Sequence, residues 1–299
     1  MSFIKINNGG SETDTIHLHY EDLGTGQPVV FVHGWPLSGD MWEYQVTELV
    51  QQGIRCISYD RRGFGKSSRP ASGYNYDTMA EDLHALLQTL QLEDVILVGF
   101  SMGGGEVARY MSRYGGERVS RIVFISSVTP YMLKTTDNPE GVDKSVFEEI
   151  MAGLKQDRIG FLDDFGKKFF GINLLHHPVS TPLLDYYRDI AAFASPIATQ
   201  QCAIAFSSTD FRDDLKTITV PTLIIHGTAD KTVPIEVSGD RTATLLPHAQ
   251  YVIYDGAPHG LFYTHKETLN KDLLKFINGR EAEGEGPLQP VGAFEDSRF

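Results

Sequence analysis

A serine stands between two glycines immediately after a short apolar run. Residues 95–98 are Val-Ile-Leu-Val, and residues 99–103 are Gly-Phe-Ser-Met-Gly. A chain that turns sharply from a buried strand into a helix leaves almost no room for side chains beside the turn, and glycine fits there because it lacks Cβ. The pattern therefore predicts a strand, a tight turn and a helix, with the Ser101 hydroxyl held at the tip of a sheet where substrate can reach it.

Apolar segments rich in β-branched residues recur along the chain and alternate with helical patterns. We expect an edge strand at 3–6 and seven further strands at 16–20, 29–33, 55–59, 95–100, 121–126, 222–226 and 251–254. Helical periodicity lies at 40–52, 77–90 and 103–114. This alternation predicts an α/β fold, in which helices cover both faces of an eight-stranded, mostly parallel sheet.

The segment between the strands at 121–126 and 222–226 has no strand pattern. It is too long for a structureless loop, and it contains helical candidates at 144–155, 161–170, 181–193 and 196–206. We therefore expect a core at 1–128 and 221–278, with a helical lid inserted at 129–220. Residues 279–299 lack periodicity, and we expect them to have no fixed structure or to be an extension left by cloning.

Charge and composition limit the possible partners. The 299 residues carry a formal net charge of -13, which argues against nucleic acid and anionic membranes as partners. The N-terminus has no secretory h-region and no apolar run reaches the length of a membrane span. The two cysteines, Cys56 and Cys202, form no disulfide framework, so we expect a reducing, cytoplasmic location.

A serine hydroxyl needs an adjacent base to become a good nucleophile. In open α/β sheets, reactive groups gather where the strands end. His259 lies in a Gly/Pro loop after the strand at 251–254, and Asp230 follows the strand at 222–226. The order Ser101, Asp230, His259 is typical of an α/β-hydrolase triad, in which the aspartate orients the histidine.

Other sites are less well supported by the residue pattern. Some hydrolases carry the acid one strand earlier, but residues 126–130 here contain no carboxylate. Residues 63–67 end like a phosphate-binding loop, yet Asp60 stands where that pattern needs glycine. No cluster of histidine, cysteine and carboxylate residues has the spacing of metal ligands. We expect neither a metal nor a cofactor.

An oxyanion hole requires backbone N–H groups that face the developing negative charge. One is expected from Met102, which follows the nucleophile at the start of a helix. The second is expected from Trp35 in the loop after the strand at 29–33, because Pro36 has no N–H.

Several motifs together resemble the cofactor-free haloperoxidase family, the aryl esterase and perhydrolase branch of the α/β-hydrolases. The similarity covers about residues 15 to 278 and is carried by His-Gly-Trp-Pro at 33–36, by residues 60–67 and 99–105, by Asp-Phe-Arg at 210–212 and by Ala-Pro-His-Gly at 257–260.

This resemblance implies the same triad and oxyanion donors, together with a small acyl pocket lined by Trp35, Val128, Phe206 and Thr232. Pro36 is similar to the residue found in members with good perhydrolase activity. The family also implies a homo-oligomer.

The expected function is hydrolysis of small aryl or alkyl carboxylic esters through an acyl-enzyme. The resemblance adds perhydrolysis, in which hydrogen peroxide attacks the acyl group of a short carboxylic acid and the resulting peracid oxidises halide without a cofactor. A γ-lactamase or amidase that uses the same triad is the alternative. A non-catalytic ligand receptor on a hydrolase scaffold is the third hypothesis.

Overall fold

The computed structural model of the chain describes residues 1–7 and 15–282, and within these residues eight strands form one sheet. The strands are β1 (Ser2–Asn7), β2 (Thr15–Leu23), β3 (Pro28–Val32), β4 (Arg55–Tyr59), β5 (Val95–Phe100), β6 (Val119–Ile125), β7 (Thr222–Gly227) and β8 (Gln250–Tyr254). Their order is β1-β2-β4-β3-β5-β6-β7-β8. β2 runs antiparallel to its neighbours β1 and β4, and the other neighbouring strands are parallel, which confirms the predicted mostly parallel sheet.

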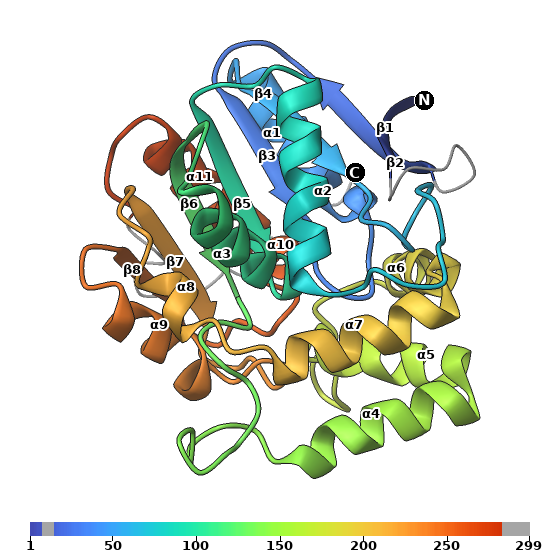
Figure 1. The fold of residues 1–299 in the computed structure, drawn as a ribbon. Coiled ribbons are helices and arrows are strands. Elements are labelled where there is room, and N and C mark those ends of the chain that lie inside the picture. The colour runs from blue at the N-terminus through green and yellow to red at the C-terminus, as the bar shows by residue number, and fades with distance from the viewer. Residues whose placement is uncertain (8–14, 283–299) are drawn as a thin grey trace, which may run out of the picture.

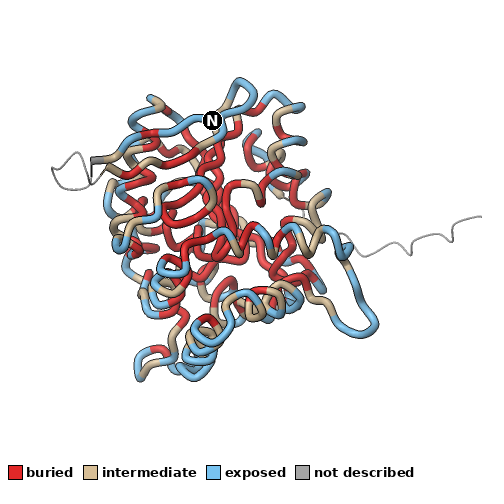
Figure 2. Tube along the Cα trace, turned by 90° about the vertical axis from the view of Figure 1, so that its right-hand side faces the viewer, coloured by how far each residue is buried: buried red, intermediate tan, exposed pale blue. Residues whose placement is uncertain are grey.

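The central strands are apolar because both of their faces are covered. Every residue of β5 and β7 is buried. Along β5, Val95 and Leu97 contact one hydrophobic core, whereas Ile96 and Val98 contact the other. This alternation follows from the two-residue period of a strand. Figure 2 shows the buried trace concentrated in the middle of the molecule.

Helices cover both faces of the sheet. On one face, α2 (Tyr76–Thr89), α3 (Met102–Tyr114) and α8 (Arg212–Leu215) lie together, with α9 (Gly239–Leu245) beside α8. Figure 1 shows α2 and α3 in front of the strands. The opposite face holds α1 (Glu43–Gln51), α10 (Leu261–Thr264) and α11 (Lys266–Ile277). The described residues also include two short 3-10 helices, η2 (Gly39–Trp42) and η3 (Ile235–Val237).

Four longer helices stand between β6 and β7. They are α4 (Lys144–Gln156), α5 (Arg158–Phe169), α6 (Thr181–Phe193) and α7 (Pro196–Ser208). Each begins at a residue whose side chain accepts a hydrogen bond from a backbone N–H of the first turn: Asp143, Asp157, Ser180 and Ser195. In Figure 1 these helices gather below the sheet. The division of the chain into core and lid stays a prediction.

Most sequence-predicted helix ends agree with the structure to within two residues. The helix expected at 40–52 is divided into η2 and α1. α5 begins three residues before the expected 161. The reason is the side chain of Asp157, which accepts a hydrogen bond from Gly160 N at 3.0 Å and so fixes an earlier start.

The chain continues beyond α11 along the edge of the sheet. Ala282 N donates to Gln250 Oε1, on β8, at 3.0 Å. The first residues of the predicted unstructured tail therefore contact the fold. The remaining part of that tail, 283–299, lies outside the described residues.

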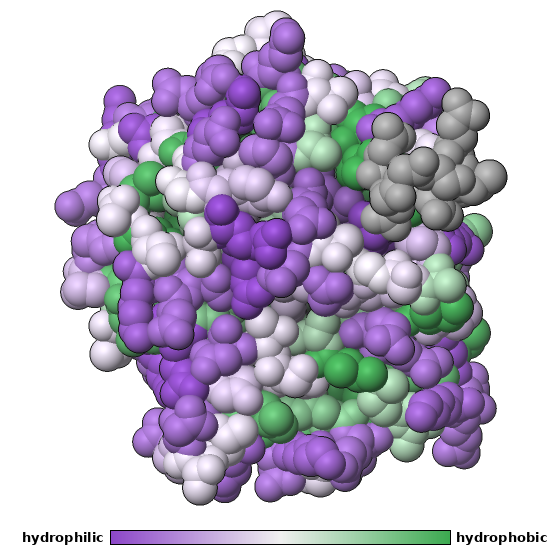
Figure 3. Space-filling view, in the orientation of Figure 1, coloured by the Kyte–Doolittle hydropathy of each residue, from purple (hydrophilic) through white to green (hydrophobic). Residues whose placement is uncertain are grey.

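The surface agrees with this layering. In Figure 3 hydrophilic side chains cover most of the visible face, and apolar side chains gather over the lower helices α4 and α7. No helix in the described ranges 1–7 and 15–282 is both long enough and apolar enough to cross a membrane.

Candidate active site

Ser101 occupies the turn between β5 and α3. Its backbone has φ 53° and ψ -119°, a region that non-glycine residues seldom adopt. A Cβ on Gly99 would lie 2.7 Å from Gly103 O, and a Cβ on Gly103 would overlap Val32 O. The two glycines are therefore required because backbone from the same turn and from β3 passes directly over them.

Three loops bring Ser101, His259 and Asp230 together. These loops follow β5, β8 and β7, which run parallel and end at the same edge of the sheet. Ser101 Oγ–H donates to His259 Nε2 at 3.0 Å, and His259 Nδ1–H donates to Asp230 Oδ2 at 2.6 Å. All three residues are buried. The tautomer that this chain of bonds requires leaves Nε2 free to take the serine proton.

Backbone amides hold the carboxylate of Asp230 in place. Its Oδ1 accepts from Thr232 N at 2.9 Å and from Val233 N at 2.8 Å. Burial alone raises the pKa of Asp230, but the charge of His259 and hydrogen bonds from His226 and His259 outweigh it, so this pKa lies well below its usual range. Asp230 is therefore ionised at neutral pH, as a group that orients a histidine must be.

His226 is a second histidine against the same carboxylate, and the residue pattern did not connect it with the site. Its Nε2 lies 2.9 Å from Val233 O and 3.4 Å from Asp230 Oδ2. The buried Nδ1 has no hydrogen-bond partner within the described residues. His226 therefore carries its proton on Nε2. The only signal in the sequence was its position four residues before Asp230.

The loop that carries Trp35 lies against the nucleophile. A Cβ on Gly34 would come within 2.6 Å of the Phe100 ring and 3.1 Å of Ser101 Cβ. Met102 is the first residue of α3, where backbone N–H groups have no partner inside the helix. The backbones of Trp35 and Met102 thus both adjoin Ser101, and their function as oxyanion donors stays a prediction.

A buried neutral histidine braces this loop. His33 Nδ1–H donates to Gly34 O at 2.9 Å, and His33 Nε2 accepts from Arg61 N at 3.0 Å. Arg61 Nη2 also donates to His33 O at 2.8 Å. Burial, together with the nearby Arg61 charge, lowers the pKa of His33 to about 3. The imidazole therefore stays neutral and can both donate and accept.

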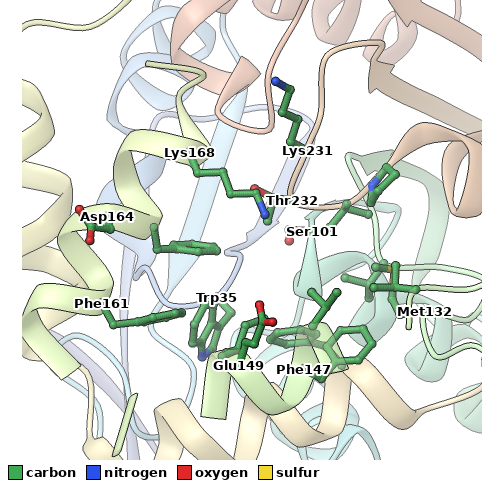
Figure 4. A pocket seen from close by; sticks show the side chains of 18 residues that line it. Trp35, Ser101, Met132, Phe147, Glu149, Phe161, Asp164, Lys168, Lys231 and Thr232 are labelled. Atoms are coloured by element: carbon green, nitrogen blue, oxygen red, sulfur yellow. The ribbon is translucent and has the colours of Figure 1, made fainter. Parts of the chain in front are cut away.

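A cavity of about 420 Å³ opens beside Ser101 (Figure 4). The four residues expected to line a pocket all lie in its wall: Trp35, Val128, Phe206 and Thr232. The Trp35 ring is fixed by a bond from its Nε1 to Thr199 O at 2.9 Å.

The rest of the wall was not expected from the sequence. It comes largely from α4 and α5, with Phe147, Ile150, Phe161 and Phe165 as apolar members. Spacings of three and four residues place these side chains on one face of each helix. This periodicity was the signal in the sequence that could have placed them in the wall. Four charged side chains also line the cavity: Glu149, Asp164, Lys168 and Lys231. Lys168 extends toward Thr232 in Figure 4.

Among residues 1–7 and 15–282, no group of three or more histidine, cysteine, aspartate or glutamate side chains could hold a metal ion. The arrangement around Ser101 supplies a nucleophile, a base, an ionised orienting group and an apolar cavity, which is what acyl transfer requires.

Known proteins share this architecture. The profile of the alpha/beta hydrolase fold family matches residues 27–266. A non-heme chloroperoxidase of Kitasatospora aureofaciens is 41% identical over 89% of this chain and 97% of its own length. A bifunctional esterase/perhydrolase of Acinetobacter calcoaceticus is 40% identical over 88% and 97%. The crystal structure of a bromoperoxidase from Bacillus anthracis is 50% identical, covers 93% of this chain and 100% of that one, and superposes with a TM-score of 0.88.

Proposed function

Since this chain belongs to the α/β-hydrolase family of cofactor-free haloperoxidases and perhydrolases, we propose that it hydrolyses small aryl and alkyl carboxylic esters through an acyl-enzyme on Ser101. The same acyl group passes to hydrogen peroxide when peroxide replaces water. The observation that carries this proposal is the continuous hydrogen-bond chain from Ser101 Oγ through His259 to Asp230, at 3.0 Å and 2.6 Å.

In the first half-reaction, Ser101 Oγ attacks the ester carbonyl while His259 Nε2 takes its proton. The negative charge that develops on the carbonyl oxygen is stabilised by the backbone N–H groups of Trp35 and Met102. Ionised Asp230 stabilises the resulting imidazolium. His259 then gives its proton to the leaving alcohol, or to the leaving hydroxyl group, which departs as water, when the substrate is a carboxylic acid. The acyl group remains on Ser101.

In the second half-reaction, a small nucleophile attacks the acyl-enzyme. His259 Nε2 takes a proton from water or from hydrogen peroxide, and the collapse of the second tetrahedral intermediate returns it to Ser101. Water yields a carboxylic acid, and hydrogen peroxide yields a peracid. The released peracid oxidises halide in solution. Every step uses groups of this chain and the two substrates.

The cavity favours substrates with an apolar body. Trp35 contacts the rings of Phe165 and Phe206 edge-on, at centroid distances of 5.2 and 5.6 Å. Aromatic walls of this kind suit aryl and short alkyl groups on either side of the ester. The lactam alternative is not favoured, because the similar relatives bear names of peroxide and ester chemistry.

Ester, lactam and peroxide turnover in one panel tests this function. Wild-type protein is expected to hydrolyse p-nitrophenyl acetate and to form peracetic acid from acetate and hydrogen peroxide, with slower or no opening of a γ-lactam. Ser101→Ala is expected to lose both activities, whereas Ser208→Ala, which changes an exposed serine on α7, keeps them. Full ester turnover by Ser101→Ala would overturn the proposal. Stable binding of esters without turnover would favour a receptor.

We also propose a homo-oligomer in the cytoplasm. Phe193 on α6 is 67% exposed, and Leu174 and Leu175 are each 97% exposed, which supports burial against another subunit. Cys56 and Cys202 are free thiols, which supports a reducing compartment. Sedimentation velocity of the purified chain tests the first point, because a single monomer peak at micromolar concentration contradicts it.

A further inference from the structure

One methionine lies in the wall of the cavity that holds Ser101. Met132, in the segment between β6 and α4, lines this cavity and is only 2% exposed (Figure 4). The chain has seven methionines, and all are among the described residues. The other six do not line the cavity: Met1, Met41, Met79, Met102, Met111 and Met151. Met132 is therefore the methionine whose thioether faces the products released from Ser101.

We propose that Met132 is a modification site, oxidised to the sulfoxide by the peracid that the chain forms at Ser101. The proposal rests on the perhydrolysis given above. In this step the Met132 sulfur attacks the terminal peroxy oxygen, the O–O bond breaks and an S–O bond forms. The sulfur loses two electrons and the peracid gains them. The peroxy proton passes to the carboxyl group, so the products are methionine sulfoxide and a carboxylic acid.

The place of Met132 favours this reaction over oxidation elsewhere. A cavity of about 420 Å³ is only a few atoms across, so a peracid released from Ser101 meets the thioether at high effective concentration before it reaches bulk solvent. Aliphatic members of the same wall, such as Val128, Val142 and Val233, offer no oxidisable atom. Neither cysteine belongs to the lining.

Met151 provides an internal comparison. It lies on α4, is partly buried and lines a separate groove between α4 and α7 that does not include Ser101. Peracid or hydrogen peroxide that arrives from solvent reaches Met151 at least as easily as Met132. Preferential oxidation of Met132 therefore indicates an oxidant made inside the cavity.

Oxidation changes the acyl and alcohol specificity of the site. The sulfoxide adds a polar oxygen to a wall whose aliphatic members include Val128, Val142 and Val233. An apolar ester must then remove water from this polar oxygen when it binds, and the expected rise in KM is about fivefold or more. Perhydrolysis thus gradually lowers the activity of the protein through the oxidation of Met132.

Peptide mapping by mass spectrometry tests the proposal. The whole protein is incubated with acetate and hydrogen peroxide, without halide, while peracetic acid is measured. The peptide that contains Met132 is expected to gain the mass of one oxygen atom in proportion to turnovers and ahead of the Met151 peptide. Ser101→Ala under the same peroxide concentration is expected to leave Met132 at the background level.

Two variants give a second, independent readout. Each is followed as the fraction of its own starting ester activity that survives perhydrolysis. Met132→Leu is expected to keep most of that fraction, whereas Met151→Leu loses it as the wild type does. If peracetic acid forms but Met132 oxidises no faster than Met151, or oxidises equally in Ser101→Ala, this proposal fails alone. If no peracid forms, the perhydrolase function fails with it.

Discussion

Replacing Asp230 by asparagine removes one charge from the site while leaving most of its hydrogen bonds intact. Oδ1 of Asp230 accepts two backbone N–H groups, from Thr232 and Val233, at 2.9 and 2.8 Å. The side-chain oxygen of an asparagine can accept both of these bonds. The fold of the loop after β7 is therefore expected to survive in Asp230→Asn.

The second carboxylate oxygen of Asp230, Oδ2, decides the activity. Oδ2 accepts from His259 Nδ1–H at 2.6 Å, but the NH₂ group of asparagine can only donate there. His259 must then carry its proton on Nε2, which faces Ser101 Oγ at 3.0 Å and can no longer take the serine proton. The expected loss in kcat is about 10⁴-fold, which corresponds to about 5 kcal/mol of transition-state stabilisation.

Steady-state hydrolysis of p-nitrophenyl acetate, with thermal unfolding followed in parallel, measures this effect. The matched control is Asp255→Asn, because Asp255 is exposed in the loop after β8 and accepts a bond from Thr228 Oγ1 at 3.0 Å rather than from the triad. The control is expected to keep its activity within about twofold. A folded Asp230→Asn protein that loses less than about tenfold would refute the assigned tautomer of His259.

Stability and specificity offer three further tests. His33 is neutral in the folded chain, with a pKa lowered to about 3, whereas an unfolded histidine gains a proton below about pH 6.5. The stability that neutral His33 contributes is therefore present above pH 6.5 and is lost as the pH falls. Between pH 7 and pH 5, the free energy of unfolding measured in urea should fall by about 2 kcal/mol less in His33→Gln than in the wild type. Gly103→Ala drives a Cβ into Val32 O and should lower the unfolding free energy by about 3 kcal/mol. The control is Gly166→Ala on α5, whose Cβ would meet only Leu184 Cδ1 at 3.4 Å, and it should leave the unfolding free energy unchanged or raise it. Calorimetric scans of both variants measure these effects. Phe165→Ala lengthens the cavity and should raise the octanoate-to-acetate ratio of kcat/KM by about tenfold; an unchanged ratio would show that Phe165 does not limit acyl length.

The sheet could be predicted because its central strands are continuous apolar runs. β5 and β7 are buried on both faces, so their residues carry a strong local signal. Parallel strands end at one edge, and this rule was enough to place Ser101, Asp230 and His259 in the same region. Predicting that these three residues meet required only the order of the strands and helices along the chain, and no side-chain contacts.

Contacts between elements far apart in the sequence could not be predicted in this way. The turn after β7 folds Asp230 back onto His226, and nothing in the residue pattern fixes the direction of that turn. Met132 faces the cavity because of the path taken by the segment between β6 and α4. The start of α5 depends on one side-chain bond to Asp157, which is a weaker signal in the sequence than the apolar period beginning at Phe161.

The acyl-enzyme on Ser101 is the intermediate on which the whole mechanism depends. The wild-type protein is mixed with p-nitrophenyl acetate, quenched in acid during turnover, digested and mapped by mass spectrometry. We expect the mass of one acetyl group on Ser101, its loss when the quench is delayed until the substrate is consumed, and its absence in Ser101→Ala. Turnover at the wild-type rate with no acetyl group on Ser101, or with the group on another residue, would contradict this mechanism.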